Sequence, residues 1–203
     1  MRQAGIYALP KRKFKRRKTT ETLLKTTNLL LPKPDIVTAN QVWYSDITFV
    51  KTAEGWLYLA AVMDAYSKRI VGYAMDDNMK TDLVVRALQM AVKQRHAPRG
   101  LIHHSDKGSQ YTSYTYQHEL AAQGMRPSFT GTGACLDNAY IESFFATLKK
   151  ELVYQSSFAN REAARSAINE FVNMYYNGWR LHSSLGYRCP NDFETQGLAR
   201  LAA

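Results

Sequence analysis

Three acidic residues occupy positions from which their side chains could bind a hard metal ion. Asp46 lies in the middle of an expected strand, Asp106 follows a short strand, and Glu142 lies on an amphipathic helical stretch. If the strands of the two aspartates are neighbours, their backbones lie about 4.8 Å apart, and the side chains could share an ion. Carboxylates with few nitrogen or sulfur ligands suit Mg²⁺ or Mn²⁺. Two such ions about 3.5–4 Å apart can stabilise the entering and leaving oxygens of an in-line displacement at phosphorus.

The distances between these residues along the chain favour a shared site. Taken alone, an Asp in a strand is usually a satisfied edge residue, and a Glu on a helix is usually solvated. Here 35 residues separate Asp106 from Glu142, and Lys149 follows Glu142 by seven. Positions seven apart on a helix differ by only about 20° in direction, so Lys149 is expected to place an anion-binding group beside the metal site. Without a metal, three clustered carboxylates would repel, and some would stay protonated near neutral pH.

Other polar residues have simpler structural explanations. Asp64 is expected to cap a turn or form an ion pair rather than to bind metal. Asp137, together with Asn138, is expected to cap the helix that carries the third carboxylate. Arg180 and His182 could contact phosphates, with packing of the C-terminal tail against the core as the equal alternative.

Two adjacent histidines do not indicate a zinc site. No second His or Cys group stands at ligand spacing from His103 and His104. We expect His104 to hydrogen-bond near Asp106 or to contact substrate. Three closely spaced tyrosines are expected to divide between core and surface, where one could stack on a base: Tyr111, Tyr114 and Tyr116.

Hydrophobic periodicity predicts an α/β chain. The expected strands are residues 42–50, 56–63, 70–75, 101–104 and 125–129. The expected helices run from a cap at Thr81 to before Pro98, from Ser113 to Gln123, from Asn138 to Leu152, and from a cap at Asn160 to before Gly178. In the first strand Trp43, Ile47 and Phe49 share an apolar face, and Asp46 lies on the other, more polar face. This order predicts a mixed sheet with helices on both faces and an antiparallel meander at its start.

Basic residues are concentrated near the N-terminus. The formal net charge is +10, and without seven basic residues of one octet it would be +3. The octet contains Lys11, Arg12, Lys13, Lys15, Arg16, Arg17 and Lys18. Such a cluster attracts phosphate backbones without reading sequence, so we expect it to bind DNA, with a solvated tail or an RNA-binding arm as the alternative. We assign residues 1–34, which end in Leu-Pro-Lys-Pro, to a basic arm and linker.

Composition narrows the class of protein. The 203 residues, 45% of them hydrophobic, suit one medium-sized domain with an appendage. Cys135 and Cys189 form no CxxC pair, which argues against a zinc module or a disulfide framework. No apolar run reaches the roughly 20 residues that span a bilayer, and no signal-peptide segment follows the basic N-terminus. We therefore expect a soluble, cytoplasmic protein without a membrane partner.

Four stretches carry a specific resemblance. They are residues 43–48 (WYSDIT), 104–111 (HSDKGSQY), 137–149 (DNAYIESFF to the lysine) and 176–190 (YN, RLHSSLGY and the proline). Through these stretches the chain resembles the DDE transposase and retroviral integrase superfamily. Within that superfamily it is very similar to the second-frame (orfB-type) transposases of bacterial insertion sequences. The resemblance covers nearly all of residues 35–198. It departs at Leu136, where the family commonly has Trp, and at Cys189, where a small hydroxyl residue is usual.

The resemblance implies an RNase H-like fold, with an integrase-like catalytic core and a C-terminal helical tail over residues 35–198. It implies Asp46, Asp106 and Glu142 as the catalytic and metal-binding triad, with two Mg²⁺ or Mn²⁺ ions per active site. Lys149 would lie near the DNA end. The implied activity is DNA strand cleavage and strand transfer at insertion-sequence ends, and the implied partners are those ends, target DNA and further copies of the chain in a multimer.

The N-terminal segment leaves alternatives open. Residues 1–10 resemble the middle of the helical segment that precedes the core in longer relatives, so a helix-turn-helix region is expected to be shortened or missing. A separate upstream-frame helix-turn-helix protein could supply it. The alternatives are a truncated, non-catalytic DNA-binding inhibitor of transposition and an RNase H-fold nuclease that hydrolyses DNA without joining it. The 35-residue spacing and Lys149 favour the transposase.

Overall fold

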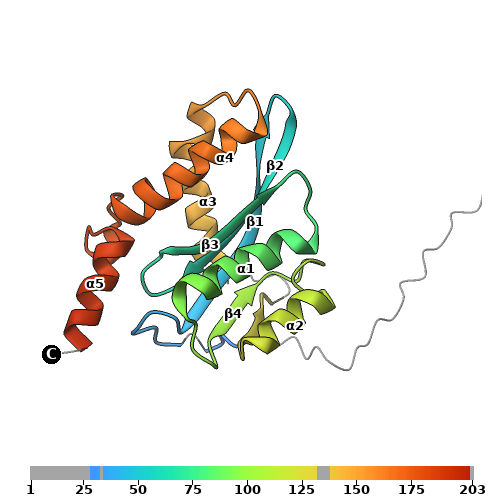
Figure 1. The fold of residues 1–203 in the computed structure, drawn as a ribbon. Coiled ribbons are helices and arrows are strands. Elements are labelled where there is room, and N and C mark those ends of the chain that lie inside the picture. Colours follow the sequence, from blue (N-terminus) through green and yellow to red (C-terminus); the bar gives the residue numbers. More distant parts are fainter. Residues whose placement is uncertain (1–27, 33, 132–137, 202–203) are drawn as a thin grey trace, which may run out of the picture.

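A five-stranded mixed sheet lies at the centre of the computed structural model, which describes residues 28–32, 34–131 and 138–201 (Figure 1). The strands are β1 (Val42–Thr52), β2 (Gly55–Asp64), β3 (Ile70–Asp76), β4 (Ile102–Ser105) and β5 (Arg126–Phe129). Their order in the sheet is β3-β2-β1-β4-β5. β1, β2 and β3 pair antiparallel, whereas β4 pairs parallel with both β1 and β5. The predicted meander is confirmed, and the condition that the strands before the two aspartates are neighbours is met.

β1 is long and its neighbour β4 is short. β1 pairs with β2 along its length, as far as Thr52↔Gly55. Gly55 closes this hairpin with φ +111°, a conformation that favours glycine. β4 pairs with β1 only as far as Ser45. In the part of the chain that the structure describes, the second half of β1 therefore has a sheet neighbour on one side only.

Helices cover both faces of the sheet, as predicted. They are α1 (Thr81–Arg95), α2 (Tyr114–Ala122), α3 (Ala139–Glu151), α4 (Arg161–Glu170) and α5 (Pro190–Leu201), the last forming the predicted helical tail. In Figure 1, α1 lies in front of the sheet and α3 behind it. α4 continues into a π-helical stretch at Phe171–Tyr176, and 3₁₀ turns lie at Val153–Gln155 and Ser183–Leu185. None of the helices described is long and apolar enough to cross a membrane.

Each face of the sheet has its own hydrophobic core, and β1 contributes alternate side chains to the two. Trp43 is buried with residues of α1 and α2, whereas Tyr44 and Val50 are buried with residues of α3 and α4. Tyr44 and Thr48, which share the face of Asp46, are each only 4% exposed. The face predicted to be more polar is therefore largely buried, because α3 packs on it.

The predicted helix starts are correct to within one residue, but not every predicted cap is. Asn160 Oδ1 accepts a hydrogen bond from Ala163 N at 2.7 Å and caps α4 as expected. Thr81 is the first residue of α1, and Lys80 is its N-cap. Asn138 precedes α3 but makes no capping hydrogen bond with its side chain, since its ψ of 12° is not the extended backbone of a normal N-cap. Asp137 lies outside the described residues.

A buried ionic cluster fixes α5 to the end of α1 and to the turn between β2 and β3. Glu194 is 6% exposed, and its carboxylate accepts hydrogen bonds from Arg95 at 2.7 and 2.9 Å, from Arg69 at 3.1 Å and from Ser67 at 2.6 Å. Burial would raise the pKa of Glu194, but these donors and charges lower it overall. Asp64 is fully buried and accepts hydrogen bonds from the backbone of the turn that follows it, which confirms its predicted role as a turn cap.

β3 and α1 approach closely at Gly72. A Cβ atom at this position would lie 2.3 Å from Ala87 O and 2.6 Å from Ala91 N. Both atoms belong to the backbone of α1, which cannot turn aside as a flexible side chain can. The missing side chain therefore sets the distance between this helix and the sheet.

Gly72→Ala is expected to destabilise the fold by about 1–3 kcal/mol, because α1 must move away from β3. Gly178 offers a matched control, since a Cβ there would meet its nearest atom at 3.7 Å. Gly178→Ala should be neutral or should stabilise the protein by up to about 1 kcal/mol. Urea unfolding measures both values, and equal stability of the two variants would contradict the close packing.

Candidate functional site

Asp46 and Asp106 lie side by side at the end of the parallel pairing between β1 and β4. The last residues in register are Ser45↔Ser105, and each aspartate comes next on its strand. Asp106 is exposed, and its Oδ1 accepts a hydrogen bond from Gly108 N at 2.9 Å. Asp46 is partly buried, and its Oδ1 accepts one from the N–H of the residue that follows it at 2.8 Å. Strand register thus brings together two carboxylates that are distant in sequence.

α3 adds Glu142 and Lys149 to the same region. Its apolar residues recur at helical spacing and are buried against the sheet: Ile141, Phe144, Phe145 and Leu148. This packing leaves Glu142 exposed and Lys149 half-buried beside β1. Both residues line a hollow of about 500 Å³, together with Asp46 and Thr48. The expectation that Glu142 and Lys149 share one face of a helix is confirmed.

The three carboxylates influence one another electrostatically. The pKa of Asp46 is raised to about 6, and burial is the largest cause. The negative charges of Asp106 and Glu142 raise it further, whereas the hydrogen bond from the Ile47 N–H and the charge of Lys149 lower it. Asp46 is therefore the member on which both of the other carboxylates act. At neutral pH this region holds mutually repelling charges, which a cation would relieve.

The residue types of the site suit a divalent cation, although the carboxylates do not lie close enough together to form a complete set of metal ligands. Among residues 28–32, 34–131 and 138–201, no three His, Cys, Asp or Glu side chains are grouped closely enough to hold an ion. The candidate donors Asp46, Asp106 and Glu142 are all carboxylates, which Mg²⁺ prefers. The raised pKa of Asp46 marks negative charge that such an ion would neutralise. The residues therefore fit Mg²⁺ or Mn²⁺ in type and charge.

Buried hydrogen bonds fix the strand ends behind the two aspartates. Ser45 Oγ donates to Ala61 O at 3.1 Å and lies 3.2 Å from Tyr111 Oη. On β4, His104 Nδ1 lies 2.9 Å from Ser128 Oγ of β5. These contacts hold the backbone immediately before Asp46 and Asp106.

The histidines of β4 are core residues. His104 is fully buried, and its Nε2 lies 3.3 Å from Thr130 Oγ1. His103 Nε2 lies 3.0 Å from Tyr116 Oη, and burial lowers the pKa of His103 to about 3, so this ring is neutral. The alternative that His104 contacts substrate is wrong, because its ring is enclosed and links β4 to the strand and loop beside it.

Other candidates are resolved by their neighbours. Arg180 Nη2 lies 2.8 Å from Glu151 Oε1, and His182 is 8% exposed with its ring 5.0 Å from that of Tyr176. Both contacts favour packing of the tail over phosphate binding. The three tyrosines divide as predicted, with Tyr111 and Tyr116 buried and Tyr114 exposed.

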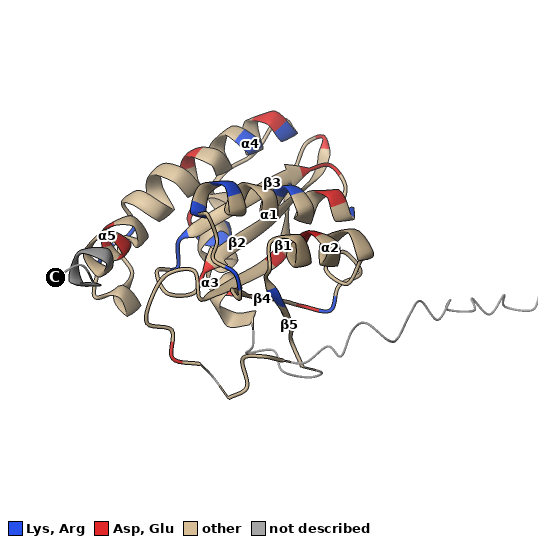
Figure 2. Cartoon of the chain, turned by 60° about the horizontal axis from the view of Figure 1, so that its bottom comes forward, with Lys and Arg blue, Asp and Glu red and all other residues tan. Residues whose placement is uncertain are grey.

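Some predicted residues lie outside the part of the chain that is described. They are the basic octet and Leu136. DNA contact by the octet therefore stays a prediction. Cys189 is described and buried, in keeping with a packing role. Figure 2 shows that both basic and acidic residues lie on α1 and on α4.

The sequence patterns did not single out three aromatic residues near Lys149. Phe49, Trp56 and Tyr154 are 51%, 46% and 73% exposed. The apolar strand pattern predicted Phe49 only as part of a buried face. Its exposure arises because α1 and α2 do not cover the hairpin end of β1 and β2. No sequence pattern connects Tyr154 with Phe49 and Trp56, because these residues come together only when the helices pack on the sheet.

Comparisons with known proteins identify the family of this chain. A family model described as an integrase core domain matches residues 37–135, and a second one with the same description matches residues 123–190. The chain is 39% identical over 200 residues to the transposase InsF of insertion sequence IS3A from Escherichia coli (strain K12), covering 98% of this chain and 69% of that protein. It is 44% identical over 184 residues to an uncharacterized 31 kDa protein of insertion element IS600 from Shigella sonnei, covering 90% and 68%.

Solved structures show the same fold. The catalytic core domain of HTLV-2 integrase in complex with magnesium superposes with a TM-score of 0.58 and 15% identity, over 78% of this chain and 98% of that chain. A chain from the simian T-cell lymphotropic virus intasome gives a TM-score of 0.65 and 16% identity, over 79% and 56%. The predicted RNase H-like fold is therefore confirmed.

In the absence of metal, Asp46→Asn is expected to stabilise the protein above about pH 6. The pKa of Asp46 in the folded protein, about 6, exceeds the ordinary value of 3.8, so ionisation of this group opposes folding. The stability that its protonated form contributes is complete below pH 3.8 and is lost as the pH rises through 6. Urea unfolding in EDTA should show wild type and variant converging at low pH and diverging at neutral pH.

Asp82→Asn serves as the control for this titration. Asp82 is exposed on α1, where it pairs with Arg86, and exposed ion pairs contribute little stability. Its difference from wild type should stay small at every pH. A difference between wild type and Asp46→Asn that does not change with pH would refute the raised pKa.

Proposed function

Because this chain belongs to the insertion-sequence transposases that carry an integrase core domain, we propose that Asp46, Asp106 and Glu142 form its catalytic, metal-binding triad. One observation carries the proposal: strand register ends β1 and β4 immediately before Asp46 and Asp106, and α3 brings Glu142 into the same hollow as Asp46. The proposed reaction is metal-dependent cleavage and joining of DNA strands.

The triad members have different proposed roles. Asp46, on which both other carboxylates act, would hold the ions together with Asp106 and Glu142. Two Mg²⁺ or Mn²⁺ ions held by these oxygens would stabilise the charge on the entering and leaving oxygens at phosphorus. In cleavage, water forms the new P–O bond and a DNA 3′-oxygen leaves. In joining, a DNA 3′-hydroxyl attacks instead, so no side chain acts as a nucleophile.

Lys149 is proposed to hold the DNA backbone beside the triad. It lines the same hollow as Asp46 and Glu142, and its positive charge lowers the pKa of Asp46. An ammonium group at this position attracts a phosphate and also offsets the repulsion among the carboxylates.

DNA ends, target DNA and further copies of this chain are the proposed partners. The HTLV-2 integrase core is described in dimeric and trimeric forms, which supports a multimer here. The basic arm and linker over residues 1–34 is proposed to contact DNA backbones, and an upstream-frame helix-turn-helix protein is proposed to help recognise the element ends. The catalytic core is assigned to residues 35–198.

Asp46→Asn, Asp106→Asn and Glu142→Gln are each expected to reduce strand cleavage and joining by about 10³-fold or more, because the three act as one unit. DNA binding should change little. The assay uses labelled oligonucleotides that carry the terminal repeats of the protein's own genetic locus, with Mg²⁺, with Mn²⁺ and with EDTA.

Glu162→Gln provides the matched control, since Glu162, like Glu142, is the acidic residue in the first turn of a helix. It should retain full activity. Joining by Asp106→Asn would overturn the assignment of the triad. Cleavage without joining by the wild type would identify a nuclease, and salt-sensitive binding without nicking would identify a non-catalytic DNA-binding protein.

Mg²⁺ is expected to raise the unfolding temperature of the wild type but not that of Asp106→Asn. A cation that binds only the folded state adds about 2.7 kcal/mol when its concentration is 100 times its Kd. Thermal unfolding with and without Mg²⁺ measures this effect without any DNA. Glu162→Gln should respond like the wild type, and equal shifts in Asp106→Asn would place the metal elsewhere.

A further inference from the structure

A second hollow adjoins the one that contains Asp46 and Glu142, and the proposed chemistry does not use it. Its volume is about 550 Å³, within the range of about 300–1,000 Å³ typical of ligand sites. We call it the aromatic hollow, and it is lined mainly by Phe49, Lys51, Trp56, Lys149, Tyr154 and Phe158. Phe49, Lys149 and Tyr154 also line the hollow that contains Asp46 and Glu142, which we call the carboxylate hollow. A ligand could therefore extend from one hollow into the other.

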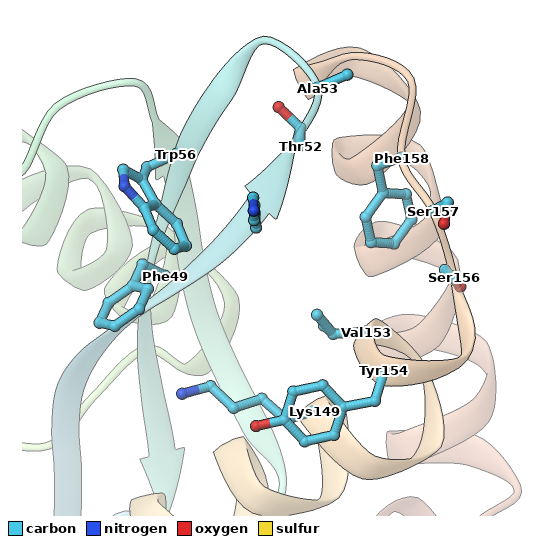
Figure 3. Close-up of a pocket in the computed structure, with 11 residues that line it drawn as sticks. Phe49, Thr52, Ala53, Trp56, Lys149, Val153, Tyr154, Ser156, Ser157 and Phe158 are labelled. Atoms are coloured by element: carbon cyan, nitrogen blue, oxygen red, sulfur yellow. The ribbon is translucent and has the colours of Figure 1, made fainter.

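The aromatic rings lie on opposite sides of this space. Phe49 and Trp56 contact each other edge to face, with ring centroids 5.0 Å apart. Figure 3 shows these two on the strand side, with Phe158 and Ser157 on the facing segment. Tyr154 lies beside Lys149 and is 73% exposed. Phe158 packs partly against the core, whereas Phe49, Trp56 and Tyr154 keep exposed ring surface on which a base could stack.

The frame of the aromatic hollow is held by hydrogen bonds between distant segments. Ala53 N donates to Phe158 O at 3.0 Å, and Arg161 Nε donates to Trp56 O at 3.1 Å. Arg161 N also donates to Glu54 Oε2 at 3.0 Å. These bonds tie the β1–β2 hairpin to the start of α4. A site that is formed in advance needs little ordering when a ligand binds.

Positive charge lies at the border with the carboxylate hollow. Lys149 Nζ lies 5.1 Å from the centroid of the Phe49 ring, and the exposed Lys51 also lines the space. Flat aromatic faces next to ammonium groups match a nucleotide, whose base stacks while its phosphate attracts the cations. A purely apolar ligand would use the rings but leave both lysines without a role.

We propose that the aromatic hollow binds one unpaired nucleobase of the DNA strand whose phosphate lies at the carboxylates. The position of that phosphate follows from the proposed function, whereas the binding of a base in the hollow does not depend on it. Stacking on aromatic rings tolerates any base, so the hollow would add affinity without reading sequence. A base held there would fix the register of the strand and so present one particular phosphate to the triad.

The test uses DNA duplexes with one unpaired nucleotide near the end, and 2-aminopurine is placed at each position in turn. The whole chain is used in EDTA, so that no strand is cut. Fluorescence should be quenched at one position only, and Trp56→Ala and Tyr154→Ala should lose this quenching. An abasic site at that position should weaken binding by the wild type roughly tenfold, the effect of one lost stack, and should barely affect binding by these variants.

Matched controls separate stacking from general damage. Trp179→Ala and Tyr187→Ala remove side chains that are 77% and 72% exposed elsewhere on the surface, and both should bind like the wild type. Tyr154→Phe retains a ring and should retain the quenching.

Several outcomes would overturn the proposal. The proposal is wrong if an abasic site weakens DNA binding at no position, or if the control variants bind DNA as poorly as Tyr154→Ala. It is also wrong if Trp56→Ala and Tyr154→Ala change only the mass measured by sedimentation, because the aromatic hollow would then bind a protein. Asp106→Asn separates the two hypotheses, because it should lose strand cleavage and keep the 2-aminopurine response. The experiments can thus reject base binding without rejecting the triad, and they can reject the triad without rejecting base binding.

Discussion

The parallel pairing of β1 with β4 is the interaction on which the whole candidate site depends. The two strands come from distant parts of the chain, and their register ends at Ser45↔Ser105, immediately before Asp46 and Asp106. The serines and the β4 histidines are buried and hydrogen-bonded, so the register is held from both faces of the sheet. A shift of one residue would turn one aspartate to the opposite face and separate the pair.

Bringing carboxylates together in this way opposes folding, and the surrounding structure must compensate. Burial and two negative neighbours raise the pKa of Asp46 to about 6. The opposing stability comes from residues other than the three carboxylates, namely the two hydrophobic cores and the ionic cluster around Glu194. Lys149 reduces the repulsion in part. The negative charge that remains would favour a cation at the proposed triad.

The shortness of β4 has a second consequence. Beyond Ser45, β1 has no strand on its β4 side within the described residues, so this edge from Asp46 to the hairpin borders open hollows instead. α3 and the segment after it line that edge and contribute Lys149 and Tyr154. Carboxylates, a cation and aromatic rings thus follow one another along a single strand edge. A polynucleotide, which repeats phosphate and base along its length, matches this series.

Local patterns in the chain were sufficient to predict the order of strands and helices, the meander and the shared face of Glu142 and Lys149, because helical and strand geometry relate neighbours directly. Resemblance to known transposases selected Asp46 and Asp106 from the other acids. No such pattern could show that Tyr44 and Thr48 are buried beside Asp46, that His104 belongs to the core, or that Phe49, Trp56 and Tyr154 surround one hollow. Those features depend on strand register and on where helices pack, and both arise from contacts between segments far apart in the chain.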